Sequence, residues 1–342
     1  MRILVIRTSA MGDVALLTPV IRALKKEYPD IEVTLVTKEA FNVFFSSVPG
    51  LHLINPDFKG RHSGLKGILS LCREITETAK PDLVVDLHNV IRTWIMKLHF
   101  WTKRIKTYTL DKGRAEKRAI IKGKNKVPLK HTTEKYLETF RKVGLKFELD
   151  AGKSIIIPGN LEGKTGEILP KGNLINIGIA PFTRHVLKEW PVSSMNKLLR
   201  MIYRKTPCNF LFFGGPDESD RIGELCSGIP NSLNLAGKVS LGEELAMMGR
   251  LEFMIAMDSA NMHMAALAGT KVISLWGATD PIIGFSPWIQ PDSYAVKIPF
   301  EELNCRPCTI YGKGKCKRGD FACMTWLTPE MVFERIVSLK LI

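Results

Sequence analysis

A carboxylate near the start of the chain follows a predicted strand, where it could have a catalytic role. The apolar-rich stretch RILVIR at residues 2–7 predicts a buried strand, and the loop TSAMGD at residues 8–13 follows it. In open parallel sheets, ligands bind beyond the carboxyl ends of the strands. Asp13 could therefore have a catalytic role, and the first N–H groups of the next helix could bind an anion. Asp13 is equally suited to cap that helix, so both roles stay open.

A loop in the second half of the chain carries cationic and hydroxyl donors. It reads PFTRHVLKEWP at residues 181–191 and follows a predicted strand that ends at Ala180. Thr183 and Lys188 are donors that suit a diphosphate, whose negative charge grows when it leaves a sugar. An ordinary basic loop before a helix would contain the same residue types, so this alternative also stays open.

Two further loops follow predicted strands in the same half. DSANMH at residues 258–263 precedes an Ala-rich helix, so Asp258 and Ser259 lie at or near a helix N-terminus that could meet a phosphate group. A lone histidine such as His263 is more often a packing residue than a ligand. WGATDP at residues 276–281 predicts another turn beside this helix.

The loop at residues 8–13 is not a known dinucleotide or nucleotide fingerprint. It has one glycine, whereas the dinucleotide pattern G-x-G-x-x-G has three, and no Gly-Lys-Ser/Thr follows as in a Walker A loop. The sequence therefore disfavours a nicotinamide-dependent enzyme.

Short apolar strands alternate with amphipathic helices along the chain, as in parallel α/β sheets. In the first half, strands are expected at residues 2–7, 32–37 and 82–87, with a helix at 14–28 and an edge strand near 103–108. In the second half, strands are expected at residues 174–180, 208–213, 232–235, 253–257 and 271–276. The predicted fold class is α/β, with two Rossmann-like doubly wound domains facing a cleft.

The domain boundary is predicted from composition. Residues 157–172 are rich in Gly, Pro and charge, which is typical of an interdomain linker. We expect an N-terminal domain at residues 1–160 and a C-terminal domain at 161–342. The last helix, about 328–342, is a candidate to pack back on the N-terminal domain. The 342 residues of the chain suffice for two domains of about 150 residues each.

The composition is that of an ordered globular protein, with 45% hydrophobic and 24% charged residues. No apolar run approaches the roughly 20 residues of a membrane span, and the N-terminus lacks the apolar core of a signal peptide, so we expect a cytoplasmic protein. The net charge is +15, and the region from Arg92 to Lys146 holds 17 Lys or Arg against 4 Asp or Glu. Such a region attracts nucleic acid, an anionic membrane or a phosphorylated glycolipid, although a merely solvated basic face would look the same.

The seven cysteines fall into two groups. Three are scattered, which suits a reducing compartment better than a disulfide framework. The other four could hold a structural zinc ion, since a tetrahedral site needs four ligands; they are Cys305, Cys308, Cys316 and Cys323. Their spacing is not a common zinc-finger pattern, so free thiols and a local disulfide remain alternatives.

Taken together, these segments resemble glycosyltransferase family nine, the ADP-heptose:lipopolysaccharide heptosyltransferases. The resemblance is carried by RTSAMGDVALLTPVIRAL, DLHNVIRT, KEWP, FFGGPDE, MDSANMHMAALAGT and WGATDP, whose order and spacing agree with the family. It implies a two-domain GT-B architecture that holds the acceptor mainly in the N-terminal domain and the nucleotide donor mainly in the C-terminal one. It also implies inversion at the anomeric carbon without a metal or other cofactor.

The resemblance assigns roles residue by residue. Asp13 matches the proposed general base and Lys188 the cation on the donor diphosphate. The remaining donor-binding residues are Thr183, Glu218 toward the nucleotide ribose, Asp258 toward a helix cap or hydroxyl, Ser259, Ala260 and His263. Many relatives have Gly where this chain has Ala260, which leaves the donor open. The expected acceptor-binding residues are Ser9, Met11, Gly12, His88 and Arg92.

The sequence thus predicts an inverting glycosyltransferase that moves a heptose from ADP-heptose to the inner core of lipopolysaccharide. The acceptor would be a lipopolysaccharide core or a lipid A precursor, reached by peripheral contact with the cytoplasmic face of the inner membrane. One alternative is a transferase of the same family with another nucleotide-sugar donor. Another is a basic nucleic-acid-binding protein, because aromatic residues such as Trp94 and Trp101 lie in the basic region. No nucleic-acid partner is expected, since no recognised binding motif accompanies the charge.

Overall fold

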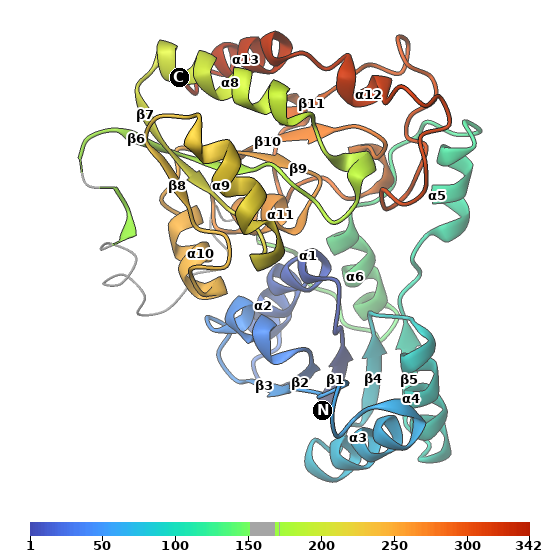
Figure 1. Cartoon of the computed structure of the whole chain (residues 1–342). Helices are drawn as coiled ribbons and strands as arrows, with labels where there is room; N and C mark the ends of the chain where they lie inside the picture. Colours follow the sequence, from blue (N-terminus) through green and yellow to red (C-terminus); the bar gives the residue numbers. More distant parts are fainter. Residues whose placement is uncertain (151–167, 171) are drawn as a thin grey trace. The chain divides into compact units, whose positions relative to one another are not determined.

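The chain divides into two compact units. The structure, a computed structural model, describes residues 1–150, 168–170 and 172–342. The first unit comprises Met1–Gly113 and Thr132–Gly152, and the second comprises Arg114–His131 and Lys153–Ile342 (Figure 1). Most of the predicted linker at residues 157–172, including the boundary at residue 160, lies outside the described residues.

The first unit is built on a five-stranded parallel sheet with the strand order β3-β2-β1-β4-β5. Its strands are β1 (Arg2–Ile6), β2 (Glu32–Val36), β3 (Leu51–Ile54), β4 (Leu83–Asp86) and β5 (Lys106–Thr109). The inner strands are apolar on both faces, as expected for strands covered by helices on both sides. The register pairs Ile6 with Asp86. The segments that follow β1 and β4 therefore emerge side by side at the carboxyl edge of the sheet.

Helices complete the first unit. They are α1 (Met11–Ala15), α2 (Thr18–Glu27), the 3-10 helix η1 (Glu39–Phe45), α3 (Gly64–Thr78), α4 (Ile91–Thr102) and α6 (Thr132–Arg141). Along α3, Leu71 and Ile75 are buried at helical spacing, and they share one apolar cluster with Met96 and Phe100 of α4 and with strand residues such as Leu4. This cluster fastens α3 and α4 to one face of the sheet.

The helix predicted at residues 14–28 is in fact two helices. α1 ends at Ala15, and α2 begins at Thr18 with Pro19 in its first turn. Proline lacks an N–H donor and fits only the first turn of a helix, so it marks a new helix start. The short strand β3, with the sequence LHLI, was not predicted because four residues give no clear periodicity.

The second unit contains a six-stranded parallel sheet with the order β11-β10-β9-β6-β7-β8. Its strands are β6 (Ile175–Ala180), β7 (Cys208–Phe212), β8 (Ser232–Asn234), β9 (Phe253–Met257), β10 (Lys271–Trp276) and β11 (Ala295–Lys297). Five of them were predicted to within two residues, whereas the three-residue β11 was not. The predicted fold class, α/β with two Rossmann-like doubly wound domains, is confirmed.

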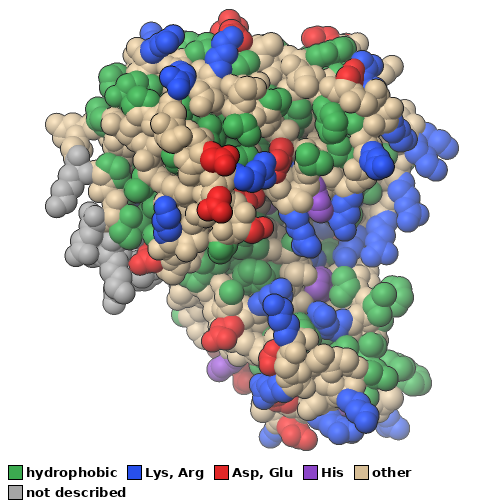
Figure 2. Space-filling view, in the orientation of Figure 1, with side chains coloured by type: hydrophobic (Ala, Val, Ile, Leu, Met, Phe, Trp, Pro, Cys, Tyr) green, Lys and Arg blue, Asp and Glu red, His purple; other side chains and the backbone are tan. Residues whose placement is uncertain are grey.

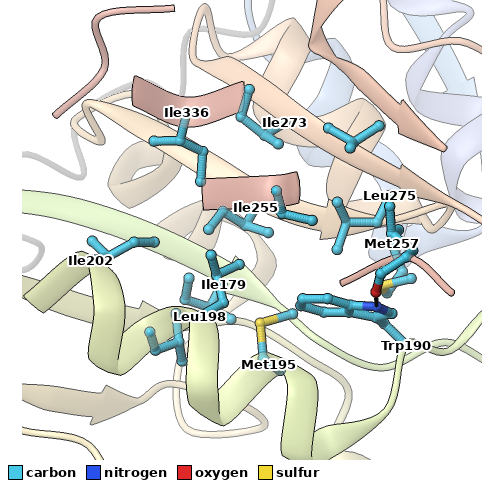
Figure 3. Close-up of a cluster of buried hydrophobic side chains, with 14 of the residues drawn as sticks. Ile179, Trp190, Met195, Leu198, Ile202, Ile255, Met257, Ile273, Leu275 and Ile336 are labelled. Atoms are coloured by element: carbon cyan, nitrogen blue, oxygen red, sulfur yellow. Dashed lines mark hydrogen bonds between the residues drawn. The ribbon is translucent and has the colours of Figure 1, made fainter. Parts of the chain in front are cut away.

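Helices complete the second unit. They are α5 (Arg114–Ile121), η2 (Val186–Lys188), α8 (Val192–Lys205), η3 (Pro216–Glu218), α9 (Ser219–Ser227), α10 (Leu241–Met248), α11 (Ala260–Leu267), η4 (Pro281–Ile283), η5 (Asp292–Tyr294), α12 (Ala322–Thr325) and α13 (Pro329–Ser338). One buried cluster joins α8 to the sheet: Met195 and Leu198 face Ile179 and Ile255 (Figure 3). Burying these side chains is the main source of stability in this layer.

The last helix packs within the second unit, and its packing on the N-terminal domain stays a prediction. α13 packs on α8, and its Val332 and Ile336 are fully buried in the cluster of the second unit. Figure 3 shows Ile336 in this cluster. α13 packs here because it has one apolar face, which lies in the same buried cluster as the apolar residues of α8.

The segment 114–131 also belongs with the second unit. The Leu129 N–H donates to the Ile282 carbonyl oxygen at 2.8 Å, and His131 Nε2 lies 2.8 Å from the Ser286 carbonyl oxygen. Ile120 of α5 packs in a cluster with Ile282. The basic region from Arg92 to Lys146 is therefore divided between the two units and does not form one continuous element.

In the part of the chain that the structure describes, no helix is both long enough and apolar enough to cross a bilayer.

Candidate active site

A buried arginine holds Asp13 in the first unit. Arg7 follows β1 directly, its side chain is 6% exposed, and its guanidinium forms an ion pair with the Asp13 carboxylate. Arg7 also donates to the Leu87 carbonyl oxygen at 2.5 Å, and its guanidinium lies 5.7 Å from the centre of the Tyr136 ring. Burial alone would lower the pKa of Arg7, but the charge of Asp13 raises it above its ordinary value. The arginine is therefore a permanent cation that fixes the carboxylate.

Asp13 is not the cap of α1. The N-cap is Ala10, and Asp13 lies in the first turn of the helix, where its side chain points to Arg7. The Tyr136 hydroxyl donates to the Asp13 carbonyl oxygen at 3.1 Å, which anchors the same turn. The capping interpretation is therefore wrong. Because the Asp13 side chain remains 28% exposed, its carboxylate can still be reached by a substrate hydroxyl group.

His88 lies beside this pair because β4 is the neighbour of β1. Its Nδ1 is 3.1 Å from the Thr8 hydroxyl oxygen, and its Nε2 is 3.1 Å from the Ser9 hydroxyl oxygen. Burial lowers the pKa of His88 to about 3, and the positive charges of Arg7, Lys112 and Arg92 act in the same direction. The ring is therefore neutral at pH 7 and shares its two nitrogens between two hydroxyl groups.

The remaining predicted acceptor residues lie around this cluster. Met11 and Gly12 form the first turn of α1. Arg92 lies in the first turn of α4, and its guanidinium stacks 3.7 Å from the centre of the Phe58 ring. The structure thus brings Ser9 and His88 into direct contact and places Arg92 close enough to influence the pKa of His88.

In the second unit, Lys188 and Asp258 form a nearly buried ion pair. Lys188 Nζ lies 3.1 Å from Asp258 Oδ2, and the two side chains are 14% and 10% exposed. The Thr279 hydroxyl donates to the same carboxylate oxygen at 2.7 Å. These residues follow β6, β9 and β10, which are adjacent strands, so they meet at one edge of the sheet. Within the protein, Asp258 therefore accepts from a hydroxyl group, while its expected role in donor binding stays a prediction.

The loop that carries Lys188 is shaped by its own polar groups. The Thr183 hydroxyl donates to the His185 carbonyl oxygen at 2.9 Å and accepts from the His185 N–H at 3.1 Å. The Thr183 N–H donates to Glu189 at 3.1 Å, and Arg221 pairs with the same carboxylate at 2.8 Å. In this structure Thr183 therefore stabilises the turn at residues 183–185 through its side-chain hydroxyl group.

Glu218 ends the loop after β7. Its Oε2 accepts from the Gly215 N–H at 2.9 Å. Burial raises the pKa of Glu218, and the negative charges of Asp217 and Glu189 add to this shift. A carboxyl group with a raised pKa, half-buried at a strand end, can accept from hydroxyl groups of a ligand.

The N-terminus of α11 lies beside the Lys188–Asp258 pair and carries a buried hydroxyl group. Ser259 is its N-cap, and Ala260 is its first residue. Within the described residues, the Ser259 hydroxyl oxygen is buried without a hydrogen-bond partner. The predicted His263 is buried one turn further along the helix. An unpaired buried hydroxyl at a helix N-terminus is a favourable donor for an anionic oxygen.

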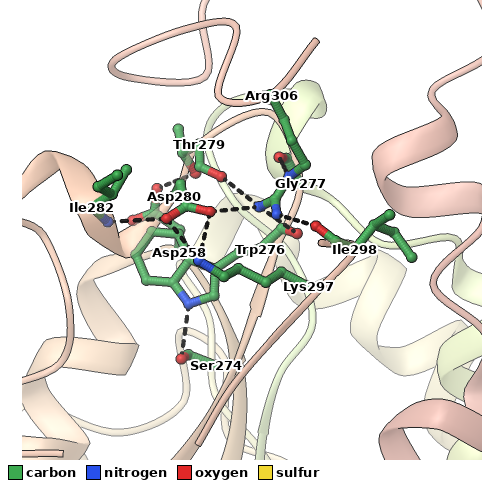
Figure 4. A network of polar contacts seen from close by, with 10 residues as sticks. All are labelled: Asp258, Ser274, Trp276, Gly277, Thr279, Asp280, Ile282, Lys297, Ile298 and Arg306. Atoms are coloured by element: carbon green, nitrogen blue, oxygen red, sulfur yellow. Dashed lines mark hydrogen bonds and ion pairs between the residues drawn. The ribbon is translucent and has the colours of Figure 1, made fainter. Parts of the chain in front are cut away.

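A buried network fixes the loop that contains Thr279. Asp280 is fully buried and accepts from Lys297 at 2.9 Å, and it lies 3.2 Å from Arg306 (Figure 4). Arg306 also donates to the carbonyl oxygens of four residues, which are Trp276, Gly277, Thr279 and Ile298. Burial lowers the pKa of Arg306, whereas Asp280 opposes that effect. This loop is therefore held by a buried cation from a distant part of the chain.

Sequence reasoning missed several of these residues. Arg306 and Tyr136 lie far along the chain from the loops that they anchor, and no motif marks them. Gly312 was also missed: a Cβ atom there would lie 2.6 Å from Lys188 Cγ, and its φ is +77°. Glycine at this position is required both by the backbone angle and by the close approach to Lys188.

Lys and Arg side chains also gather over α5 and the loops beside it in the second unit (Figure 2). Residues 114–131 hold seven Lys or Arg against one Glu. This part of the predicted basic region therefore presents a positive surface on the unit that carries Lys188.

The four clustered cysteines line one cavity of about 540 Å³ in the second unit, together with Leu187 and Arg306. All seven cysteines are free thiols in this structure, so the local disulfide is not formed. Among the residues described, no group of three or more His, Cys, Asp or Glu side chains is arranged to hold a metal ion. Burial raises the pKa of Cys323 to about 11.

Comparisons with known proteins agree on one family. The sequence profile of glycosyltransferase family 9 (heptosyltransferase) matches residues 68–310. A relative in Campylobacter jejuni, lipooligosaccharide heptosyltransferase 2, is 24% identical over 99% of this chain and 98% of its own.

Solved structures of the same family share the fold. A family 9 glycosyltransferase from Veillonella parvula has a TM-score of 0.78 at 22% identity, over 99% of this chain and 96% of its own. The E. coli ADP-heptose lipopolysaccharide heptosyltransferase II has a TM-score of 0.70 at 17% identity, over 99% and 98%. These similarities match the fold predicted from the sequence.

His88 predicts a pH dependence of stability that a neutral replacement removes. Its pKa is about 3 in the native state but about 6.5 in the unfolded chain, so between these values only the unfolded chain binds a proton. His88 should cost about 1.4 kcal/mol of stability per pH unit as the pH falls below about 6.5. In urea unfolding, the stability of the wild type relative to His88→Gln should decrease from about pH 7 to about pH 5. If the difference in stability between the two proteins does not change with pH, His88 does not have a lowered pKa in the native state.

Arg306→Met should destabilise the second unit by about 3–5 kcal/mol, because Asp280 and several carbonyl oxygens lose a buried cationic partner. Lys271→Met is the matched control, since Lys271 pairs with Glu252 at the surface, and it should cost less than about 1 kcal/mol. Chemical denaturation of both variants measures the difference. Equal stabilities of the two variants would show that the network in Figure 4 is not needed for folding.

Proposed function

Since this chain belongs to glycosyltransferase family 9, the heptosyltransferases, we propose that it transfers a heptose from ADP-heptose to the inner core of lipopolysaccharide. The observation that carries this proposal is the set of groups at the carboxyl edge of the second sheet: Lys188, Asp258 and the unpaired Ser259 hydroxyl at the N-terminus of α11. A cation, a hydroxyl and free helix N–H groups at one strand edge are the donors that a diphosphate requires.

In this proposal, Asp13 is the general base. An acceptor hydroxyl attacks the anomeric carbon of the heptose, its proton passes to the Asp13 carboxylate, and the bond from that carbon to the diphosphate oxygen breaks on the opposite face. Arg7 keeps the carboxylate in one orientation, and its burial makes this orientation rigid. The reaction inverts the configuration at the anomeric carbon because attack and departure occur on opposite faces.

Lys188 would stabilise the negative charge that grows on the departing ADP. Asp258 holds the ammonium group in place and is itself held by Thr279. Ser259 and the first N–H groups of α11, including that of Ala260, would bind phosphate oxygens, and Thr183 shapes the loop around them. Glu218 would accept from the ribose hydroxyl groups, and His263 packs beneath the helix N-terminus.

The acceptor would lie against the first unit. Ser9, Met11, Gly12 and His88 offer hydroxyl, backbone and imidazole groups next to Asp13, and Arg92 offers a cation for a phosphate or acidic sugar. An acceptor of this kind is a lipopolysaccharide core or lipid A precursor. We therefore also propose that the protein works at the cytoplasmic face of the inner membrane through peripheral contact.

The donor assignment is tested by titration calorimetry with ADP, GDP, UDP and NAD in the absence of added metal. ADP should bind most tightly, and Lys188→Ala should weaken it about 10- to 100-fold because one charge-assisted hydrogen bond is lost. Lys271→Ala, which removes an exposed lysine, should leave ADP binding unchanged. Preference for UDP or GDP would retain the transferase but reassign its donor, and no binding of any nucleotide would defeat the proposal.

The base assignment is tested by Asp13→Asn, which keeps the shape of the side chain but cannot take the proton. Its kcat should fall about 10²- to 10⁴-fold, while its affinity for ADP stays at the wild-type value. Asp82→Asn is the control, because it breaks an exposed Asp–Arg pair in the same unit. Turnover by Asp13→Asn at the wild-type rate would rule out this base.

A further inference from the structure

Helix α4 has two apolar faces, and only one of them is used in the core. Met96 and Phe100 are buried against the sheet and α3. On the outer side, four large apolar side chains recur at intervals of three and four residues and are more than half exposed: Ile91 (75%), Trp94 (51%), Leu98 (63%) and Trp101 (73%). This spacing places all four in one stripe along the helix, which we call the outer stripe.

Such a stripe is unusual for a surface in water. Single exposed apolar residues are common, but a continuous row of two tryptophans and two aliphatic side chains marks an interaction surface. One residue of this row, Trp94, is held in place by polar contacts. The Trp94 Nε1–H donates to the Asn89 side-chain oxygen at 3.0 Å, and Lys97 Nζ lies 5.9 Å from the centre of its ring. The outer stripe is thus partly pre-arranged before anything binds it.

Within residues 87–110, which span α4 and β5, the charged side chains have one sign, because this segment contains no Asp or Glu. Its cations are Arg92, Lys97, Lys103, Arg104 and Lys106. Lys97 pairs with the buried Asp86 and Arg92 stacks on Phe58, which leaves Lys103, Arg104 and Lys106 for an anionic partner. The neighbouring helix α3 carries both signs: Arg73 lies close enough to His99 to help burial lower its pKa, while Glu74 pairs with Arg61 and Glu77 is exposed. The partner that fits this surface is apolar within and negatively charged at its boundary.

We propose that the outer stripe of α4 docks on an anionic phospholipid bilayer. The helix would lie in the plane of the membrane surface, with its apolar side chains among the upper acyl chains and its cations at the headgroup phosphates. Tryptophan suits this position because its ring is apolar while its N–H is polar. The choice of a bilayer rests in part on the proposed function, since a lipid-anchored acceptor lies at that boundary. Figure 2 shows apolar side chains at the edge of the first unit where α4 lies.

Other occupants fit the same residues less well. Two copies of α4 packed stripe to stripe would bring Lys103, Arg104 and Lys106 of one copy toward those of the other, with no acidic residue in 87–110 to compensate. A nucleic acid would pair with the cations and stack on Trp94 and Trp101, but it offers no apolar partner to Ile91 and Leu98. A bilayer satisfies the aliphatic, aromatic and cationic groups together.

The test is sedimentation of the full-length protein with vesicles, without nucleotide or sugar acceptor. Vesicles of phosphatidylcholine with about 30% phosphatidylglycerol should bind the protein at low ionic strength, and vesicles of phosphatidylcholine alone should bind it less. The double variant Leu98→Gln/Trp101→Gln should bind the anionic vesicles at least about tenfold more weakly, because two large apolar contacts are lost. Brominated acyl chains should quench tryptophan fluorescence in the wild type and quench less in the variant.

The matched control replaces exposed apolar residues of the second unit by the same amide. Val192 and Trp326 are 45% and 46% exposed, and Val192→Gln/Trp326→Gln should bind vesicles like the wild type. The docking proposal is overturned if the wild type stays in the supernatant, or if the α4 variant binds as tightly as the wild type. It is also overturned if the wild type is a dimer in solution that the α4 variant dissociates. Since ADP titration is independent of vesicles, failure of this docking leaves the proposed donor chemistry standing, and the reverse also holds.

Discussion

The buried carboxylate of Asp280 is the constraint on which the second unit depends. A fully buried charge needs a partner, and here two cations, Lys297 and Arg306, reach it from separate segments. The same arginine binds four backbone carbonyl groups, so the loop after β10 has little freedom. That loop carries Thr279, whose hydroxyl fixes Asp258, and Asp258 in turn fixes Lys188. The position of the cation proposed to bind the diphosphate is thus the last link in a chain of buried polar contacts.

The first unit uses the same principle with fewer residues. Arg7 directly follows the central strand, is buried, and pairs with Asp13. Its guanidinium also donates to the Leu87 carbonyl oxygen and lies over the Tyr136 ring. Parallel strands β1 and β4 bring His88 to the same edge, where burial keeps it neutral. In both units a charged side chain of the candidate site is oriented by a buried residue of opposite charge, and the proposed chemistry needs this fixed orientation.

The sequence predicted the architecture well because its strands are short apolar runs that end in distinctive loops. The strands at 253–257 and 271–276 were placed to the residue, since parallel strands buried on both faces leave a clear pattern. The four-residue β3 and three-residue β11 are too short for any period to show, and Pro19 splits a helix that apolar spacing alone would join. For the site, the loops were found but their partners were not. Arg306 acts on residues about 30 positions away, and spacing carries no information about such contacts.

The central claim is that this chain transfers a heptose from ADP-heptose, and a direct transfer assay tests it. Purified protein would be incubated with ADP-heptose and with lipopolysaccharides whose inner cores are truncated at successive steps. The masses of the products would be determined by mass spectrometry. The account predicts that one truncated acceptor gains a single heptose unit, with release of one ADP per transfer. The claim is contradicted if no acceptor gains heptose, whether the protein transfers a sugar from another nucleotide sugar or transfers no sugar at all.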